Sequence, residues 1–518
     1  MGLNSIIDLK EPVKGLTEPV FFLDLNIDQI LERVTGGNRK IRAFYEYFPL
    51  DKECTLYRRM IYRDIREKGL FKVFSEFEER YTEFRELERK KKETRVSVQR
   101  PVWNIYAIKL YTETLMKLLK ELEETGPESE GIRALKEYLA HTVGEKAFCE
   151  MHDKSVELTK ELEGLNVTAT YEKGRVQVDI KDKDLNEDVD EDDENYKNYH
   201  IYEEFLDTFD AENPKEFVNP FETVEELTSF EQEVVKIVSK RNPEWMKKTE
   251  KLYEDCSNFE DESFFRLYEE LPYYLSFYSF EESMKKRGMI FCEPEEDEAK
   301  YISAEGLYDL ALACVNYEKG KPVVSNDFYY SDKDLFFVLT GPNQGGKTTF
   351  ARSLGQLMYF SKMGLDVPAV KANVHYYTDL LTHFSVEESV ETGRGKLMEE
   401  LVRLSPMMKY AKDNAFVVIN ELFTTAANYD AIIMGKNVLD HFVNQNCHGI
   451  YVTHLSELCD TDSHVAGLSA QLDENGIQNF KILRKSVAYE GCAENQIKKY
   501  KLDYSSLQGR LKEIMDRA

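Results

Sequence analysis

The sequence predicts a chain in two parts: a mostly α-helical region up to about residue 300, then an α/β domain built on a parallel sheet. Three observations support this fold class. The first 300 residues carry apolar side chains at three- and four-residue spacing on charged backgrounds. From about Glu298, short apolar runs alternate with helical segments, as in a sheet covered by helices on both faces. One of these runs leads into a glycine-rich loop that opens a helix.

The composition is typical of a large, helix-rich cytoplasmic protein. The chain has 518 residues, of which 42% are hydrophobic and 32% charged. That length allows about three or four domains at roughly 150 residues each. The N-terminus has no basic region followed by an apolar one, and no apolar run approaches the roughly 20 residues of a membrane span, so no secretion signal and no membrane partner are expected. The eight cysteines form no CxxC pair, which favours reduced thiols over a zinc site or a disulfide framework.

The net charge of −28 opposes non-specific binding to nucleic acids, because the field of the whole molecule repels phosphates. One concentrated basic stretch stands out against this background, "RKKKETRVSVQR" at Arg89–Arg100. We interpret it as the solvated end of a helix, and a local contact with phosphates remains the alternative.

Helices are predicted first, followed by a small β insertion. The early helical patterns lie at Leu25–Val34, Cys54–Lys68, Phe71–Lys92 and Trp103–Glu124. "VTATYEKGRVQVDI" (Val167–Ile180) then alternates apolar and polar residues around Lys173-Gly174, which predicts a β-hairpin. Long amphipathic helices crowded with aromatic residues resume between Val224 and Lys286.

An acidic segment follows the hairpin. Asp182–Glu194 contains nine carboxylates against one lysine, and we interpret it as a solvated loop or insertion. A calcium-binding EF-hand loop fits poorly, because Glu187 stands where the tight turn needs glycine. The expected division of the chain is a helical core at 1–165, a hairpin and acidic insertion at 166–215, further core helices at 216–300, the α/β domain at 301–490 and a terminal element at 491–518.

The α/β domain is predicted from five segments. Strands are expected at Leu335–Thr340, Ala415–Asn420 and Gly449–His454, and helices at Thr348–Met363 and Tyr429–Val443. Between the first strand and the first helix, "GPNQGGKT" matches the GxxxxGK[ST] phosphate loop. Its backbone N–H groups and the helix N-terminus can wrap an anion, and Lys347 can meet the β- and γ-oxygens of a nucleotide. We therefore predict ATP and Mg²⁺ as cofactors, bound by Gly341, Pro342, Asn343, Gln344, Gly345, Gly346, Lys347, Thr348 and Thr349.

Two further strand ends carry candidate catalytic residues. The strand "AFVVI" ends in Asn420-Glu421, where ATPases with this loop place a metal-holding aspartate and then a glutamate that polarises water. Glu421 fits the second role. Asn420 can orient a metal-bound water but adds no charge, so with Thr348 it makes a weak metal site and predicts slow turnover. His454 ends another buried strand; a lone histidine is more often structural, but this position suits a γ-phosphate sensor. The expected catalytic set is Glu421, His454 and Lys347.

Together these motifs resemble the ATPase domain of the MutS family, whose members carry TGPN-x-GGK-[ST] at the phosphate loop. The resemblance extends through Asn326 in "VVSNDF", "TGRGKLMEEL" (Thr392–Leu401), "NELFTTAANYDA" and "VTHLSEL". It covers the chain from roughly Phe21 onward and is strong from about Val323.

The resemblance implies an ABC-like P-loop ATPase that works as a homodimer, with each site completed by the partner subunit. The completing segment would comprise Thr392, Gly393, Arg394, Gly395 and Lys396. Val323 and Asn326 would contact the nucleotide, and residues 491–518 would form a helix-turn-helix that strengthens the dimer. The upstream helices would be the family's core and lever.

Several positions depart from the family pattern. The trans-acting serine falls at Gly395, the aromatic residue that stacks on adenine falls at Val323, and the metal-holding aspartate is Asn420. The stretch before Phe21 is too short for the mismatch-reading and connector domains, so a reduced branch of the family is expected.

Two functions stay open. The first is a dimeric, slowly hydrolysing ATPase that clamps DNA in repair or recombination. The second is an ATP-switched scaffold that docks a protein or ribosomal partner through its helical arms and acidic segment. An endonuclease has no support in the sequence.

Overall fold

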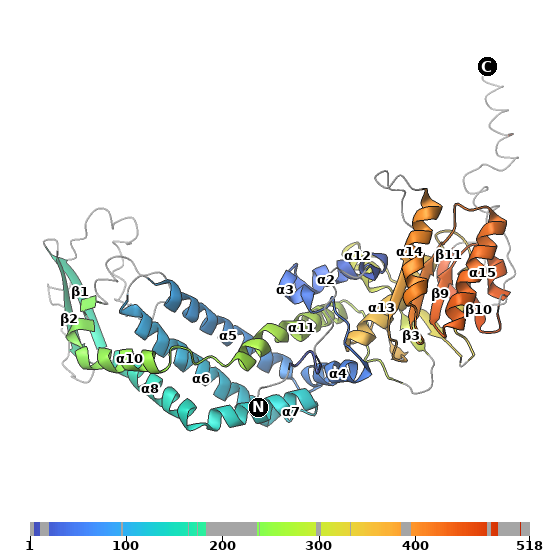
Figure 1. Ribbon diagram of the computed structural model, residues 1–518. Helices are drawn as coiled ribbons and strands as arrows, with labels where there is room; N and C mark the ends of the chain where they lie inside the picture. The colour runs from blue at the N-terminus through green and yellow to red at the C-terminus, as the bar shows by residue number, and fades with distance from the viewer. Residues whose placement is uncertain are drawn as a thin grey trace, which may run out of the picture. The chain divides into compact units, whose positions relative to one another are not determined.

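A computed structural model of the protein (Figure 1) describes residues 5–10, 20–94, 97–163, 165–172, 175–182, 236–237, 239–296, 302–331, 333–384, 395–460, 462–473, 478–484 and 508. The chain divides into two compact units. Unit 1 comprises Met1–Ile6 and Asp64–Leu271, and unit 2 comprises Ile7–Arg63 and Pro272–Ala518. The domain boundaries expected at 165, 215, 300 and 490 stay predictions. Among the described residues, no helix combines the length and the apolar character that crossing a membrane requires.

Unit 1 is helical. Its helices are α5 (Leu70–Glu93), α6 (Gln99–Thr125), α7 (Glu130–Gly144), α8 (Lys146–Glu163) and α10 (Pro243–Asp255), and the unit boundaries fall within α4 (Lys52–Glu67) and α11 (Glu262–Lys285). Apolar side chains of α6, α8 and α10 form one core, which contains Val102, Ile105, Ile108, Leu158, Leu162, Trp245, Met246 and Leu252. The helices predicted from the amphipathic patterns at Cys54–Lys68, Phe71–Lys92 and Trp103–Glu124 are confirmed as α4, α5 and α6.

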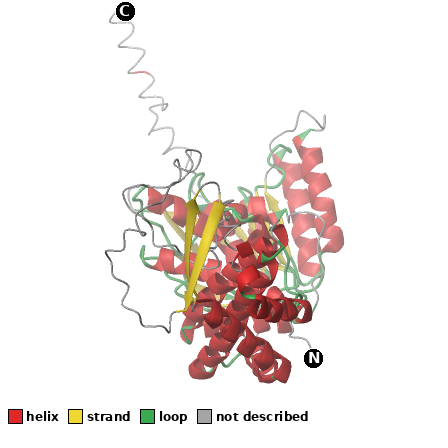
Figure 2. Cartoon of the chain, turned by 90° about the vertical axis from the view of Figure 1, so that its left-hand side faces the viewer, coloured by secondary structure: helices red, strands yellow, loops and turns green. Residues whose placement is uncertain are grey.

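The predicted β-hairpin is also confirmed. Strands β1 (Leu165–Glu172) and β2 (Arg175–Asp182) pair antiparallel, with Glu172 opposite Arg175. They are the two long neighbouring strands drawn in yellow in Figure 2. The predicted turn at residues 173 and 174 and the acidic segment beyond Asp182 lie outside the described residues.

Two cations of the basic stretch that begins at Arg89 are paired with acidic neighbours. The guanidinium of Arg89 forms ion pairs with Glu86 at 2.5 Å and with Glu93 at 2.6 Å. Lys91 is buried, where its Nζ pairs with Glu88 and donates to Asn104 Oδ1 at 3.0 Å. Lys91 therefore belongs to the interior of unit 1, and these two cations offer less positive charge to a phosphate than the sequence predicts.

Unit 2 contains a six-stranded sheet with parallel and antiparallel pairs, in the strand order β11-β10-β5-β9-β8-β7. The strands β10, β5, β9, β8 and β7 are parallel, and β11 pairs antiparallel at one edge. Their bounds are β5 (Phe336–Thr340), β7 (Leu380–Phe384), β8 (Phe416–Asn420), β9 (His448–Val452), β10 (Val465–Leu472) and β11 (Gln478–Arg484). The predicted strand and helix alternation is confirmed, although β7, β10 and β11 were not predicted.

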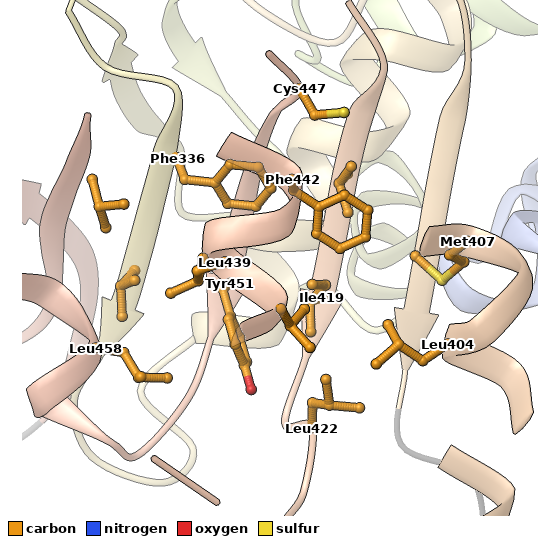
Figure 3. Packing of buried hydrophobic residues seen from close by; sticks show 14 of the residues in the cluster. Phe336, Leu404, Met407, Ile419, Leu422, Leu439, Phe442, Cys447, Tyr451 and Leu458 are labelled. Atoms are coloured by element: carbon orange, nitrogen blue, oxygen red, sulfur yellow. The ribbon is translucent and has the colours of Figure 1, made fainter. Parts of the chain in front are cut away.

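Helices cover both faces of this sheet. Every residue of β5, β8 and β9 is buried, as expected for strands packed on two sides. On one face, α14 (Lys396–Tyr410) and α15 (Asn428–Asn444) close over an apolar cluster shown in Figure 3, with members such as Ile419, Leu439 and Tyr451. The other face carries Phe337, which contacts Phe328, and Phe328 in turn contacts Phe350 of α13 (Lys347–Met363).

A second, three-stranded sheet and several short helices complete unit 2. The antiparallel order is β4-β3-β6, from β3 (Ser303–Leu307), β4 (Asn326–Tyr329) and β6 (Lys371–Asn373). The helical elements are α1 (Phe21–Asp24), α2 (Ile27–Thr35), α3 (Arg39–Ala43), α12 (Leu310–Glu318) and the 3₁₀ helix η3 (Ser456–Asp460). Residues 7–63 group with this unit, and α13 shows why. A Cβ at Gly355 of α13 would lie 2.4 Å from a methyl of Leu25, so only glycine allows this close packing.

The C-terminal end of α13 is firmly held. The last carbonyls of a helix have no partner within it and need donors from elsewhere. Here Arg59 Nη2 donates to Ser361 O at 2.9 Å, the Thr55 hydroxyl to Lys362 O at 3.0 Å and the Tyr273 hydroxyl to Met363 O at 2.7 Å. Because these donors lie on α4 and α11, the helix that follows the glycine-rich loop is fixed at its far end.

Candidate functional site

The predicted site residues meet at the carboxyl edge of the parallel sheet, where loops that follow parallel strands gather. The glycine-rich loop follows β5, Glu421 follows β8, and His454 follows β9 by two residues. A cavity of about 370 Å³ opens at this edge, within the size range of small-ligand sites. Its wall includes residues 343–350 and Glu421, together with Leu307, Tyr308, Asp309, Leu312, Asn316, Pro322, Val324, Asn326, Ser353 and Phe480.

The loop needs glycine for two separate reasons. Gly341 and Gly346 have φ values of 127° and 87°, which side-chain-bearing residues rarely adopt. At Gly345 a Cβ would lie 2.9 Å from the carbonyl oxygen of Pro342, so space is lacking there. The loop therefore turns tightly into the N-terminus of the 17-residue helix α13, and the first N–H groups of a helix have no partner within it and suit an anion.

Lys347 places a buried cation inside this loop. Its side chain is only 4% exposed, and its Nζ donates to the carbonyl oxygens of Gly341 and Pro342, both at 2.9 Å. Burial lowers the pKa of Lys347, while the charge of Glu421 acts in the opposite direction. Among the described residues, no carboxylate lies within 4.0 Å of this ammonium group. A buried ammonium group with only carbonyl partners is well suited to an anionic ligand.

Thr348 and Asn420 form an oxygen-rich pair. The Thr348 hydroxyl donates to Asn420 Oδ1 at 3.0 Å, which links the start of α13 to the end of β8. Both groups present oxygen atoms, the ligand type that Mg²⁺ prefers. Within the described residues, no cluster of three or more His, Cys, Asp or Glu side chains could hold a metal ion. The donor set therefore fits a Mg²⁺ ion that takes its remaining ligands from phosphates and water.

Glu421 lies on a strained turn. Its φ is 55° and that of Phe423 is 63°, and such conformations cost of order 1–3 kcal/mol each in residues other than glycine. Two hydrogen bonds hold the turn: Glu421 N donates to Val452 O at 2.9 Å, and Phe423 N donates to Glu400 Oε2 at 3.0 Å. Strain of this kind persists where the surroundings enforce it, which is typical of functional sites.

The carboxylate of Glu421 faces His454, with Oε1 and Nε2 3.4 Å apart. The pKa of Glu421 lies below its ordinary value of 4.5, chiefly because of the hydrogen bond to His454, with smaller effects of Lys347 and Lys396. Glu421 is therefore ionised at neutral pH. Because its pKa is depressed, its stabilising contribution is present above the ordinary value and is lost as the pH falls through the folded-state pKa.

The side of the cavity near β11 differs from the expectation that Val323 would contact the ligand. Val324 lines the cavity and Val323 is not among its lining residues. Asn326 is buried, and its side chain accepts from Ile482 N at 2.9 Å and donates to Phe480 O at 3.1 Å. It thereby holds β11 beside the cavity, where the ring of Phe480 is 43% exposed.

Sequence reasoning missed Phe480. It lies well over a hundred residues beyond the glycine-rich loop, on a strand that the hydrophobic pattern did not predict. Its φ of 60° is unusual for an aromatic residue in a strand, and a Cβ added at Gly346 would meet the ring at 3.4 Å. No feature of the sequence around "QNFKIL" could have placed this ring over the loop.

The predicted trans segment is described only in part. Thr392, Gly393 and Arg394 lie outside the described residues. Gly395 is the N-cap of α14, with φ −69° and open space where a Cβ would stand, so the backbone there does not require glycine. Lys396 opens α14, and its charge contributes to the lowered pKa of Glu421.

Comparison with known proteins adds a family assignment to this geometry. Residues 337–518 match the family model described as MutS domain V. Curated relatives are DNA mismatch repair proteins MutS from several bacteria. The one from Dinoroseobacter shibae is 27% identical over 197 residues, which cover 38% of this chain and 21% of the relative. The one from Petrotoga mobilis is 29% identical over 134 residues, or 26% and 16% of the two chains.

A longer but more distant match extends further toward the N-terminus of this chain. The MutS protein of Fervidobacterium nodosum is 22% identical over 308 residues, which cover 57% of this chain and 35% of that protein. In these three comparisons the chain thus spans between about a sixth and a third of each relative. The glycine-rich loop and both candidate catalytic strand ends fall within the region matched to MutS domain V.

Proposed function

Since this chain belongs to the MutS family, we propose that it binds ATP with Mg²⁺ at the carboxyl edge of the unit 2 sheet and hydrolyses it slowly. The observation that carries this proposal is the buried ammonium group of Lys347, enclosed by a loop whose glycines allow it to turn tightly into the N-terminus of α13. Mg²⁺-dependent release of phosphate from ATP by the purified chain tests it.

We propose the following role for each residue of the site. Loop amides and Lys347 hold the β- and γ-phosphates, and Thr348 with Asn420 holds Mg²⁺, which when bound neutralises phosphate charge. Glu421 accepts a hydrogen bond from the attacking water and orients it toward the γ-phosphorus. His454, 3.4 Å from Glu421, keeps that carboxylate ionised and turned toward the cavity. Because Asn420 carries no charge, the metal is held less tightly and turnover is slow.

Phe480 is proposed to stack on the nucleotide base. Its ring and the aliphatic side chains of Val324 and Leu312 line the cavity at the side of β11 and α12. Phe480→Ala should weaken ATP binding by roughly 5- to 160-fold, since stacking of a base on an aromatic ring contributes about 1–3 kcal/mol. Inorganic triphosphate has no base, so its affinity should be unchanged.

Isothermal titration of both ligands provides the measurement. The matched control is Phe265→Ala, a change of the same type in unit 1, which should alter neither affinity. Equal losses for ATP and triphosphate in the Phe480 variant would contradict a base-stacking role.

A homodimer is proposed to complete each site through the N-terminus of α14. If the N-terminus of α14 meets the partner's γ-phosphate, Gly395→Ser supplies the hydroxyl that this position lacks. The backbone accepts the change, because nothing lies within 4 Å of the new Cβ. Turnover per site should rise, by up to about 10²- to 10³-fold, the effect of a single well-placed donor to developing negative charge.

The measurement is steady-state ATPase activity against protein concentration, where the gain should appear only as dimers form. Gly144→Ser is the control, since Gly144 also has open space around it. A gain that does not depend on protein concentration would contradict completion in trans.

The partner is proposed to be DNA, by kinship with mismatch repair proteins, whereas the charge distribution favours a second candidate, a scaffold for a basic protein. Net charge is −28, and Arg89 and Lys91 are matched by carboxylates. Binding to duplex and branched DNA with ATP should be measured across a salt series. A steep loss of affinity with salt supports phosphate contacts, and no binding at about 50 mM salt supports the scaffold.

A further inference from the structure

Glu400 is a buried carboxyl group to which the proposed reaction assigns no role. It lies in the second turn of α14 and is 0% exposed. Its hydrogen-bond partner Phe423 belongs to the apolar cluster of Figure 3, which also includes Leu404 and Leu422. Its Oε2 accepts the backbone N–H of Phe423 at 3.0 Å. Among the described residues its Oε1 has no hydrogen-bond partner. Burying a carboxyl group with one oxygen unpaired costs free energy of folding, so its hydrogen bond to Phe423 is unlike a contact that merely adds stability.

That hydrogen bond holds the turn that carries Glu421. The turn has two left-handed residues, Glu421 and Phe423, and is attached to β9 at one end through Glu421 N and Val452 O. The other end depends on Glu400, because Phe423 N is buried and has no backbone acceptor in the turn. Without the carboxyl oxygen this amide would be buried and unpaired, and the turn could relax to an ordinary conformation.

We propose that Glu400 is a positioning residue that fixes the Glu421 turn from the second turn of α14. This inference rests on the proposed ATPase function. It also links Glu421 to the start of α14: Glu400 lies four residues beyond Lys396, one helical turn from the segment predicted to meet the partner's nucleotide. Glu400 therefore connects the start of α14 to the turn that carries Glu421.

The requirement is for an acceptor oxygen and not for a charge. Burial raises the pKa of Glu400, and the Phe423 amide, which favours the ionised form, opposes this only in part. Glutamine has the same shape and keeps an acceptor oxygen, so it is the conservative substitute. Alanine removes the acceptor. Leu404→Ala is a matched control, since Leu404 is buried on the same helix one turn later and makes no contact through a polar group.

The kinetic test compares these three variants with the wild type. Glu400→Ala should lower kcat by about 10- to 100-fold with KM for ATP nearly unchanged, because the base is displaced while the phosphate loop is intact. Glu400→Gln should keep kcat within about twofold, and Leu404→Ala should lower the melting temperature without this loss of kcat. Equal kcat in Glu400→Ala and wild type overturns the proposal, as does an equal loss in Leu404→Ala.

A second measurement tests whether Glu400 holds the turn and does not depend on ATP hydrolysis. Hydrogen exchange at the Phe423 amide should speed up strongly in Glu400→Ala and stay slow in Glu400→Gln and Leu404→Ala. Slow exchange in Glu400→Ala would overturn the proposal whatever the ATPase activity. A wild-type chain that does not hydrolyse ATP would contradict the proposed function alone, and the exchange result would still show whether Glu400 holds the turn.

Discussion

Replacing Glu421 with glutamine is expected to abolish ATP turnover while ATP remains bound. Asp309 and Glu421 are the acidic residues of the described cavity wall, and of these Glu421 is paired with His454 and interacts electrostatically with Lys347. Glutamine matches its shape and leaves the backbone hydrogen bond to Val452 in place, but it cannot act as a base. Loss of general base catalysis should lower kcat by about 10²- to 10⁴-fold.

Binding of ATP should survive this change or strengthen slightly. A negative charge near the γ-phosphate is removed, and Lys347 and the loop are untouched. Single-turnover hydrolysis and equilibrium binding of labelled ATP measure the two effects separately. Glu457→Gln is the matched control, because it removes an exposed carboxylate three residues beyond His454 and should change neither. Unchanged hydrolysis in Glu421→Gln would remove Glu421 from the catalytic role.

Replacing Lys347 with alanine is expected to abolish tight ATP binding. Lys347 is 4% exposed as a residue, and its ammonium group donates to two carbonyl oxygens of the loop. A phosphate bound there would meet this charge largely shielded from water, where screening is weak. Removing one partner of such a buried contact typically costs about 2–5 kcal/mol, or roughly a 30- to 4,000-fold loss of affinity.

Thermal unfolding measures this loss directly. ATP at 100 times its Kd stabilises a protein by about 2.7 kcal/mol, so the wild type should unfold at a higher temperature with Mg-ATP. The Lys347→Ala variant should show no such shift. Its ligand-free unfolding temperature is the baseline for that comparison, because the two hydrogen bonds from Nζ to the carbonyl oxygens of Gly341 and Pro342 are lost. Lys436→Ala, which removes an exposed lysine of α15, should behave like the wild type. An undiminished ATP shift in Lys347→Ala would show that the phosphates bind elsewhere.

The sequence predicted the elements that carry local patterns. Residues 335–340, 348–363, 415–420 and 429–443 were placed within one residue at each end of β5, α13, β8 and α15. The hairpin of β1 and β2 was found because alternation and a turn signal lie within a few residues of each other. The strand ends also put Glu421 and His454 at one edge, since parallel strands share their direction.

What the sequence could not predict depends on contacts between distant residues. Phe480 reaches the cavity only because β11 adds antiparallel to β10 and is held by Asn326, which lies more than 150 residues earlier. The role proposed for Glu400 depends on its contact with Phe423, which follows β8 by three residues and lies 23 residues beyond Glu400. Residues 7–63 group with unit 2 because Leu25 fits against Gly355. Periodicity in one segment carries no information on any of these pairings.

Titration of the wild-type chain with ATP in the presence of Mg²⁺ is the most direct test of the central claim that the loop at 341–348 is a nucleotide site. Saturable binding of about one ATP per chain, competed by inorganic triphosphate and lost in Lys347→Ala, is the predicted result. Absence of saturable binding, or binding that Lys347→Ala leaves unchanged, would contradict it.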